Sequence, residues 1–120
     1  MKIAFPVQSR EGLEGQLSNH FGRAPKFVIY NTTKEEFQSI DNLGDHFGGK
    51  TSTPKLLKQN QVNILICKGV GRRAINQLTK DGVEIYITQQ QNVKEALKAY
   101  FLGELPIASE DDGCADSHNH

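Results

Sequence analysis

The chain has 120 residues, with 14 basic and 14 acidic side chains and a formal net charge of zero. This length suits one domain with its own core, and the charge balance disfavours a dedicated nucleic-acid-binding protein, which usually carries a basic excess on one face. No apolar run is long enough to span a bilayer, and residues 1–7 are too short for a signal peptide and are interrupted by Pro6, so we expect a cytoplasmic protein.

The first part of the chain predicts three strands. The apolar residues 2–7 predict a first strand, and the polar, glycine-containing residues 8–18 predict a loop. Residues 26–30 and 36–40 predict two further strands. Because only a short polar segment separates these two strands, we expect them to form a hairpin.

The middle of the chain predicts a helix followed by a buried strand. Thr53 is a predicted N-cap, Pro54 occupies the first helical position, and Asn60 is a predicted stop. The almost unbroken apolar run at 62–67 predicts a strand that is covered on both faces. A glycine-containing turn at 69–71 then leads into a second helix.

Two helices and a last strand complete the predicted domain. The second helix has an apolar side that includes Ile75 and ends near Gly82, and residues 83–87 predict the last strand. Residues 93–101 carry an apolar stripe behind a capping pair of Asn92 and Glu95. The element order β-β-β-α-β-α-β-α predicts an α/β fold whose second half contributes parallel strands with right-handed crossovers.

The predicted loops place basic and metal-ligating side chains at one edge of the sheet. In open α/β sheets, ligands collect at the carboxyl ends of the strands, where we expect residues 8–24, 41–53 and 68–73 to meet. These loops and the adjoining strand end carry His20, Arg23, His46, Lys50, Cys67, Lys68, Arg72 and Arg73. A basic, glycine-lined cleft suits an anionic ligand, whereas the alternatives are a solvated charged rim and, for Cys67, a buried core thiol.

Residues 44–51 match the phosphate-binding pattern G-x-x-x-x-G-K-[ST]. Their context disfavours this function, because the preceding strand at 36–40 alternates like a hairpin partner and Pro54 delays the following helix. Neither later strand ends in the aspartate that positions magnesium in such enzymes. Nucleotide or phosphate binding through Gly44 to Thr51 is therefore kept as an alternative function.

The chain after residue 106 predicts a flexible, acidic tail with almost no apolar content. It contains Cys114, His118 and His120, whose thiolate and imidazoles are ligands for zinc, copper or iron. A solvated terminus is the alternative. The two cysteines, Cys67 and Cys114, do not make a disulfide framework, and in a reducing compartment they are free thiols or metal ligands.

Several short segments, in their order and spacing, resemble the dinitrogenase iron-molybdenum cofactor biosynthesis family, the NifX-like domains. The segments are residues 2–7, the L-S-N-H-F-G-R-A stretch at 17–24, Gly48-Gly49, the strand and G-V-G turn at 62–71, and the last helix at 93–105. The resemblance covers residues 1–106. It implies an α/β fold of the ribonuclease-H-like type, with a five-stranded mixed sheet flanked by helices and no nuclease function.

The resemblance also implies a non-enzymatic binding or carrier protein for an iron–sulfur or iron–molybdenum–sulfur cluster or its precursor. Its partners would be that cluster or another small anion, together with cofactor-assembly proteins, without nucleic acid or a membrane. The residues expected to contact the ligand are His20, Phe21, Gly22, Arg23, Gly48, Gly49, Gly69 and Gly71. The candidate metal ligands are His20 and Cys67, with Cys114, His118 and His120 as donors from the tail. A ligand-free regulatory interaction module is the remaining alternative.

Overall fold

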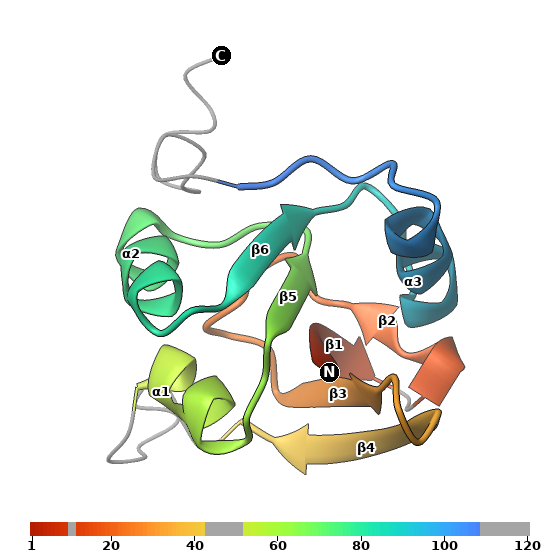
Figure 1. Cartoon of the computed structure of the whole chain (residues 1–120), viewed down its shortest axis with the longest axis horizontal. Coiled ribbons are helices and arrows are strands. Elements are labelled where there is room, and N and C mark those ends of the chain that lie inside the picture. The colour runs from red at the N-terminus through yellow and green to blue at the C-terminus, as the bar shows by residue number, and fades with distance from the viewer. Residues whose placement is uncertain (10–11, 43–51, 109–120) are drawn as a thin grey trace.

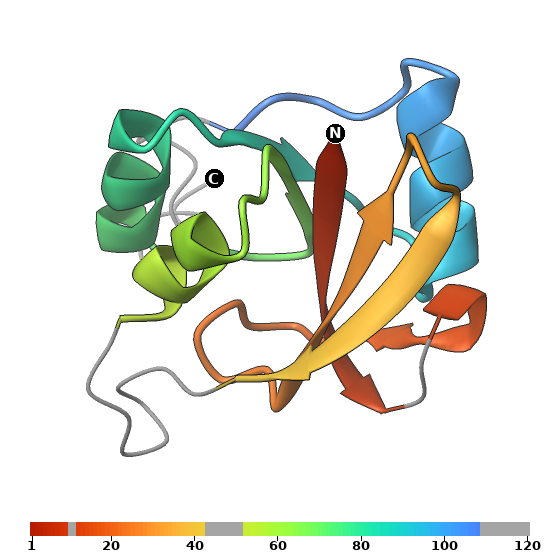
Figure 2. The same ribbon diagram turned by 60° about the horizontal axis from the view of Figure 1, so that its bottom comes forward.

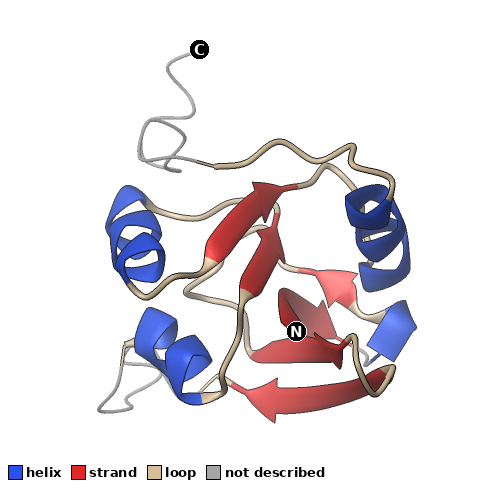
Figure 3. Cartoon of the chain, in the orientation of Figure 1, coloured by secondary structure: helices blue, strands red, loops and turns tan. Residues whose placement is uncertain are grey.

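The computed structural model describes residues 1–9, 12–42 and 52–108 of the chain (Figures 1 and 3). Several predicted site residues lie outside these ranges, so their predicted roles stay predictions. They are the phosphate-loop match at residues 44–51, including His46, Gly48, Gly49 and Lys50, and the tail donors Cys114, His118 and His120.

A mixed sheet of six strands forms the centre of the molecule. Five strands follow the order β4-β3-β1-β5-β6, and β2 pairs with β1 outside this path. The strands are β1 (Lys2–Ser9), β2 (Gln16–Leu17), β3 (Lys26–Asn31), β4 (Glu36–Asp41), β5 (Ile64–Cys67) and β6 (Glu84–Ile87). β1 is parallel to β5 and antiparallel to β3, which is itself antiparallel to β4. The carboxyl ends of β1, β4 and β5 therefore lie at one edge of the sheet.

The expectation of five strands is wrong, because the predicted loop at 8–18 contains the short strand β2. Leu17 pairs with Val7 of β1. The Leu17 N–H donates to the carbonyl oxygen of Gln91 at 2.9 Å, and the Val93 N–H donates to that of Gly15 at 2.9 Å. Tertiary hydrogen bonds thus define β2. The assignment to a ribonuclease-H-like fold stays a prediction.

The strand β1 changes its partner along its length. β5 pairs with Ile3 and Ala4, and β2 takes over at Val7. Pro6, which has no N–H to donate, lies between these two pairings, and its carbonyl oxygen accepts from the Ser18 N–H at 2.9 Å. The chain therefore leaves β2 directly at the carboxyl end of β1.

Helices cover both faces of the sheet (Figures 1 and 2). α1 and α2 pack on one face in a core cluster that includes Leu57 and Leu65, and α3 packs on the other face in a cluster that includes Phe5 and Val93. The helices are α1 (Thr53–Gln59), α2 (Arg72–Lys80) and α3 (Val93–Phe101). None of the described helices is long and apolar enough to cross a membrane.

The first helix begins one residue earlier than the predicted cap implies. Ser52 is the N-cap of α1, and its Oγ accepts from the Lys55 N–H at 3.3 Å, so Pro54 occupies the second helical position. Thr53 is helical, and its hydroxyl instead donates to the Oδ1 atom of Asn42 at 3.4 Å. The sequence does not distinguish two adjacent hydroxyl residues as caps, because the choice depends on this tertiary partner.

Residues 106–108 pair with the last strand of the sheet, β6. The Ile87 N–H donates to the carbonyl oxygen of Pro106 at 3.0 Å, and the Ala108 N–H donates to that of Ile85 at 2.8 Å. Ala108 is buried in the same core cluster as α1 and α2. Residues 107 and 108, which the sequence predicts to begin the tail, therefore cover the edge of β6.

Candidate functional site

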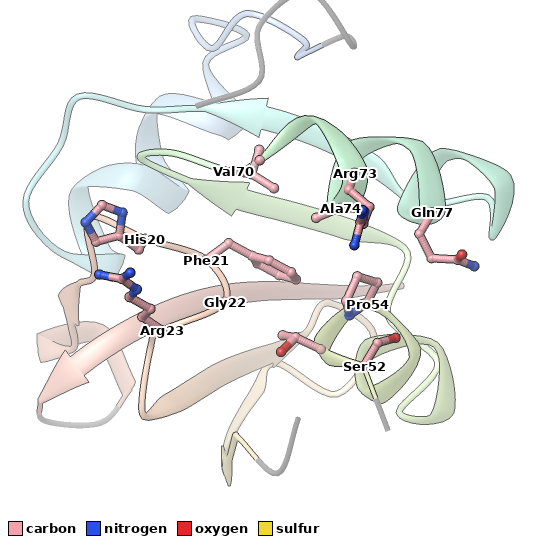
Figure 4. Close-up of a pocket in the computed structure, with 12 residues that line it drawn as sticks. His20, Phe21, Gly22, Arg23, Ser52, Pro54, Val70, Arg73, Ala74 and Gln77 are labelled. Atoms are coloured by element: carbon pink, nitrogen blue, oxygen red, sulfur yellow. The ribbon is translucent and has the colours of Figure 1, made fainter. Parts of the chain in front are cut away.

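A pocket of about 500 Å³ opens at the edge of the sheet where β1, β4 and β5 end (Figure 4). Its walls come from three distant segments: the loop before β3, the start of α1, and the turn and first half of α2. The lining residues are His20, Phe21, Gly22, Arg23, Ser52, Thr53, Pro54, Val70, Gly71, Arg73, Ala74 and Gln77. The prediction that these three loops meet is confirmed.

The pocket has an apolar floor and a basic rim. Phe21 and Val70 are 3% and 1% exposed, and the Phe21 ring packs against Phe27 with ring centroids 5.6 Å apart. Figure 4 shows Arg23 beside His20 at one end of the pocket and Arg73 at the other, with Phe21 between them. Because the described lining residues include no carboxylate, the rim is positively charged.

The position of His20 is set by a local turn. The Oγ atom of Ser18, which is buried, donates to the carbonyl oxygen of His20 at 2.9 Å and accepts from the His20 N–H at 3.2 Å. The next residue, Phe21, is anchored in the core. The S-x-H-F pattern therefore fixes the backbone and leaves the His20 imidazole exposed at the rim.

A buried amide that the sequence analysis missed holds the rest of this loop. The Nδ2 atom of Asn42 donates to the carbonyl oxygens of Gly22 at 3.1 Å and Ala24 at 2.8 Å, and its backbone N–H donates to that of Pro25 at 2.9 Å. Only 4% of Asn42 is exposed. Nothing in its sequence spacing marks this role, since its partners lie far from it along the chain.

The start of α2 offers hydrogen-bond donors and a positive dipole end to the pocket. Gly71 is the N-cap and makes no side-chain capping hydrogen bond, and the first turn contains no acidic residue. The first N–H groups of a helix lack intrahelical partners, and a cation in this turn, such as Arg73, opposes the helix dipole. A bound anion would therefore be stabilised by the N–H groups and the arginine together.

Two glycines line the pocket without a structural need for glycine. A Cβ atom built on Gly22 or Gly71 would meet no heavy atom within 4 Å, and neither residue has a positive φ. The fold thus accepts a side chain at both positions. What glycine provides there is a close approach to the backbone.

The family model described as "Dinitrogenase iron-molybdenum cofactor" matches residues 1–103. The chain belongs to this family. The resemblance observed in the sequence is thereby confirmed. An uncharacterized protein of Methanocaldococcus jannaschii is 31% identical over 111 residues, which cover 88% of this chain and 89% of that relative.

Several solved structures share the fold of this protein. The apo form of the orange protein from Desulfovibrio gigas has a TM-score of 0.78 and 23% identity, over 89% of this chain and 92% of that chain. A Thermotoga protein provisionally described as a NifB protein has a TM-score of 0.72 and 25% identity, over 88% and 91%. The similarity spans nearly the whole described domain.

Other residues predicted for the site of this family member lie outside the pocket lining. Cys67 is fully buried in the core cluster beside α1 and α2, which is the alternative predicted for its thiol. Lys68 donates from Nζ to the Oε1 atom of Gln91 at 3.0 Å. Gly69 and Arg72 also lie outside the lining. The roles of Cys67 and Gly69 toward a ligand stay predictions.

The described side chains do not assemble a metal site by themselves. Within residues 1–9, 12–42 and 52–108, no group of three or more His, Cys, Asp or Glu side chains is placed to hold a metal ion. His20 supplies an imidazole at the rim, and the side chain beside it is that of Arg23, which is not a metal ligand. The two arginines of the rim favour an anionic ligand.

The titratable groups with shifted pKa values lie at a second surface depression, lined in part by Tyr86, Tyr100 and Phe101. Burial raises the pKa of Tyr86, and Glu84, whose Oε1 accepts from the tyrosine hydroxyl at 3.1 Å, raises it further. Burial and the charge of Glu84 also raise the pKa of Tyr100. Neither tyrosine lines the basic pocket of this dinitrogenase iron-molybdenum cofactor family protein.

Proposed function

We propose that this protein binds and carries a metal–sulfur cluster, of the iron–sulfur or iron–molybdenum–sulfur type, or its anionic precursor, and that it does so without catalysis. The observation that carries the proposal is the pocket at the strand ends, in which Arg23 and Arg73 flank an apolar floor. Family membership supports a role in the metabolism of the iron–molybdenum cofactor. Cofactor-assembly proteins in the cytoplasm are the proposed donors and recipients.

The chemistry of such a ligand matches the pocket. Metal–sulfur anions spread their negative charge over soft sulfide ligands, so they favour apolar contacts together with weakly hydrated guanidinium groups. Phe21 and Val70 supply the apolar contacts, and Arg23 and Arg73 supply the charge. The backbone N–H groups at the start of α2 donate to the sulfides. The His20 imidazole adds a donor that iron and other transition metals accept.

The hydroxyl groups at the pocket support carriage over catalysis. Ser52 accepts the Lys55 N–H and caps α1, and the Thr53 hydroxyl donates to Asn42. Both hydroxyls are thus engaged in holding the walls, and within the described residues neither has a hydrogen bond to a histidine base that would activate it as a nucleophile.

The position of β4 disfavours the alternative of nucleotide binding through residues 44–51. β4 precedes this segment and lies at the edge of the sheet, whereas the phosphate-binding loop joins a buried strand directly to a helix. The helix α1 begins only at Thr53, with Ser52 as its cap. The local framework therefore differs from that of a nucleotide-binding loop.

Anaerobic titration tests the proposal. The protein is mixed with tetrathiomolybdate or with ferrous iron and sulfide, freed of excess reagent by gel filtration, and assayed for visible absorption and for bound molybdenum and iron. The variant Arg23→Ala/Arg73→Ala is compared with Lys80→Ala/Lys98→Ala, which removes equal charge from exposed helix positions outside the pocket. We expect uptake by the wild type and the lysine variant and at least about a tenfold loss of affinity in the arginine variant. No uptake by the wild type, or equal affinities in both variants, would contradict the proposal.

A further inference from the structure

The buried Asn42 connects two walls of the pocket. On one side, its Nδ2 donates to the carbonyl oxygens of Gly22 and Ala24, at 3.1 and 2.8 Å. On the other side, its Oδ1 accepts from the hydroxyl of Thr53, in the first turn of α1, at 3.4 Å. Asn42 itself lies outside the pocket lining and is 4% exposed. Its side chain thus connects the loop that contains Arg23 to the start of α1, on the side of these segments that faces away from the pocket.

This arrangement requires the amide of asparagine. An amide has two N–H donors and a carbonyl acceptor, and Asn42 uses both kinds of group. An aspartate of the same shape would place a carboxylate against two carbonyl oxygens, and an apolar residue would leave those oxygens without their donor. The residue type is therefore specific to this connection.

The two carbonyl groups that Asn42 holds flank Arg23 in the sequence. In a trans peptide the N–H points opposite to the preceding C=O, so fixing the Gly22 carbonyl toward Asn42 turns the Arg23 N–H away from it. Fixing the Ala24 carbonyl sets the other peptide plane. The direction in which the Arg23 side chain leaves the backbone is therefore determined by Asn42, while Arg73 is held independently by α2.

We propose that Asn42 is a positioning residue of the pocket. It places Arg23 against the ligand and sets the distance between the Arg23 loop and the start of α1. The inference rests on the proposed function, because its measure is the affinity for the anion. Residues that orient a ligand-binding group from behind typically change affinity by roughly 10- to 100-fold when replaced. We therefore expect Asn42→Asp to raise the Kd for tetrathiomolybdate by about that factor.

A double-mutant cycle distinguishes positioning from general support of the fold. Equilibrium dialysis measures the tetrathiomolybdate Kd for Asn42→Asp, Arg23→Ala and the combination, and thermal unfolding shows that each protein is folded. If Asn42 acts through Arg23, Asn42→Asp raises the Kd by a clearly smaller factor once Arg23 is alanine, because only the repulsion of the anion by the added carboxylate remains. In the matched cycle with Arg73→Ala, the two effects on Kd multiply. Equal behaviour of the two cycles would overturn the inference.

A second variant covers the case in which Asn42→Asp does not fold. Thr53→Val nearly keeps the side-chain volume and replaces the hydroxyl that donates to Asn42 with a methyl group. We expect a smaller loss of affinity that disappears in the Arg23→Ala background, and a loss that persists there would overturn the inference. A wild-type protein that does not bind overturns the proposed function and the inference with it. A wild type that binds, with independent effects of Asn42 and Arg23, overturns the inference alone.

Discussion

Replacement of Gly71 by alanine separates what the fold needs from what the pocket needs. Gly71 has a φ of −73°, which any residue adopts, and a Cβ atom there would meet no heavy atom within 4 Å. Alanine restricts the unfolded chain, which stabilises the protein by about 0.4–1 kcal/mol, and is a poorer N-cap than glycine by a similar amount. We therefore expect the free energy of unfolding of Gly71→Ala to stay within about 1 kcal/mol of the wild-type value.

Ligand binding is expected to respond differently. Gly71 lines the pocket at the start of α2, so the added methyl group keeps an anion away from the backbone N–H groups. A hydrogen bond to a charged partner contributes about 1.5–3 kcal/mol, and about 1.4 kcal/mol corresponds to a tenfold change in affinity. Loss of one such contact raises the Kd for tetrathiomolybdate roughly 10- to 100-fold.

Gly82→Ala is the matched control with the opposite outcome. Gly82 follows α2 outside the pocket and has a φ of +81°, where alanine costs about 1–2 kcal/mol. This variant should lose stability in urea unfolding and keep its affinity in equilibrium dialysis. The reasoning is refuted if Gly71→Ala binds like the wild type, or if it loses as much stability as Gly82→Ala.

Three further predictions concern the framework. Phe21→Ala should cost about 3 kcal/mol of unfolding free energy in urea, the low end for a buried phenylalanine because the pocket lies beside it, and a cost below about 1 kcal/mol would mean that the loop is not anchored there. Tyr86 should titrate above 10 in ultraviolet absorbance, and Glu84→Gln should lower its pKa. Because the folded state favours the neutral phenol of Tyr86, the raised pKa stabilises the protein below pH 10, and this stabilisation is lost as the pH rises through the pKa of Tyr86 in the folded protein. An unchanged titration of Tyr86 in Glu84→Gln would contradict the role given to Glu84. A chain ending at residue 108 should have the same urea concentration at its unfolding midpoint as the full chain. A chain ending at residue 105 should have a lower midpoint, because residues 106–108 pair with β6.

The elements that sequence patterns predicted correctly are those with enough residues to show a periodicity. β3 and β4 form the predicted hairpin, and α3 follows its predicted cap, in which the Asn92 side chain accepts from the Glu95 N–H at 2.9 Å. The strand β2 escaped prediction because two residues carry no period, and its hydrogen bonds come from β1 and Gln91. The pairing of Ala108 with β6 also escaped prediction, because it is a tertiary contact.

The candidate site likewise contains residues that the sequence predicted and one residue that it did not. The loop from His20 to Arg23 and the turn at Gly71 were predicted from their place in loops after strands and from the resemblance to the family, and the structure brings them to one pocket. Asn42 was missed, because its importance depends on the carbonyl oxygens of Gly22 and Ala24, which lie 20 and 18 positions away in the sequence. A polar residue that follows a strand is otherwise ordinary.

The most direct test of the proposed carrier function is elemental analysis of protein purified anaerobically, performed on the full chain and on a chain ending at residue 108. The shorter chain retains the pocket and the residues that pair with β6, and it lacks Cys114, His118 and His120. We predict that, after incubation with tetrathiomolybdate or with ferrous iron and sulfide, both chains retain metal and sulfide in equal amounts, and that Arg23→Ala/Arg73→Ala reduces this amount in both. Metal that is absent from both chains, or that disappears with residues 109–120, would contradict a site in the pocket.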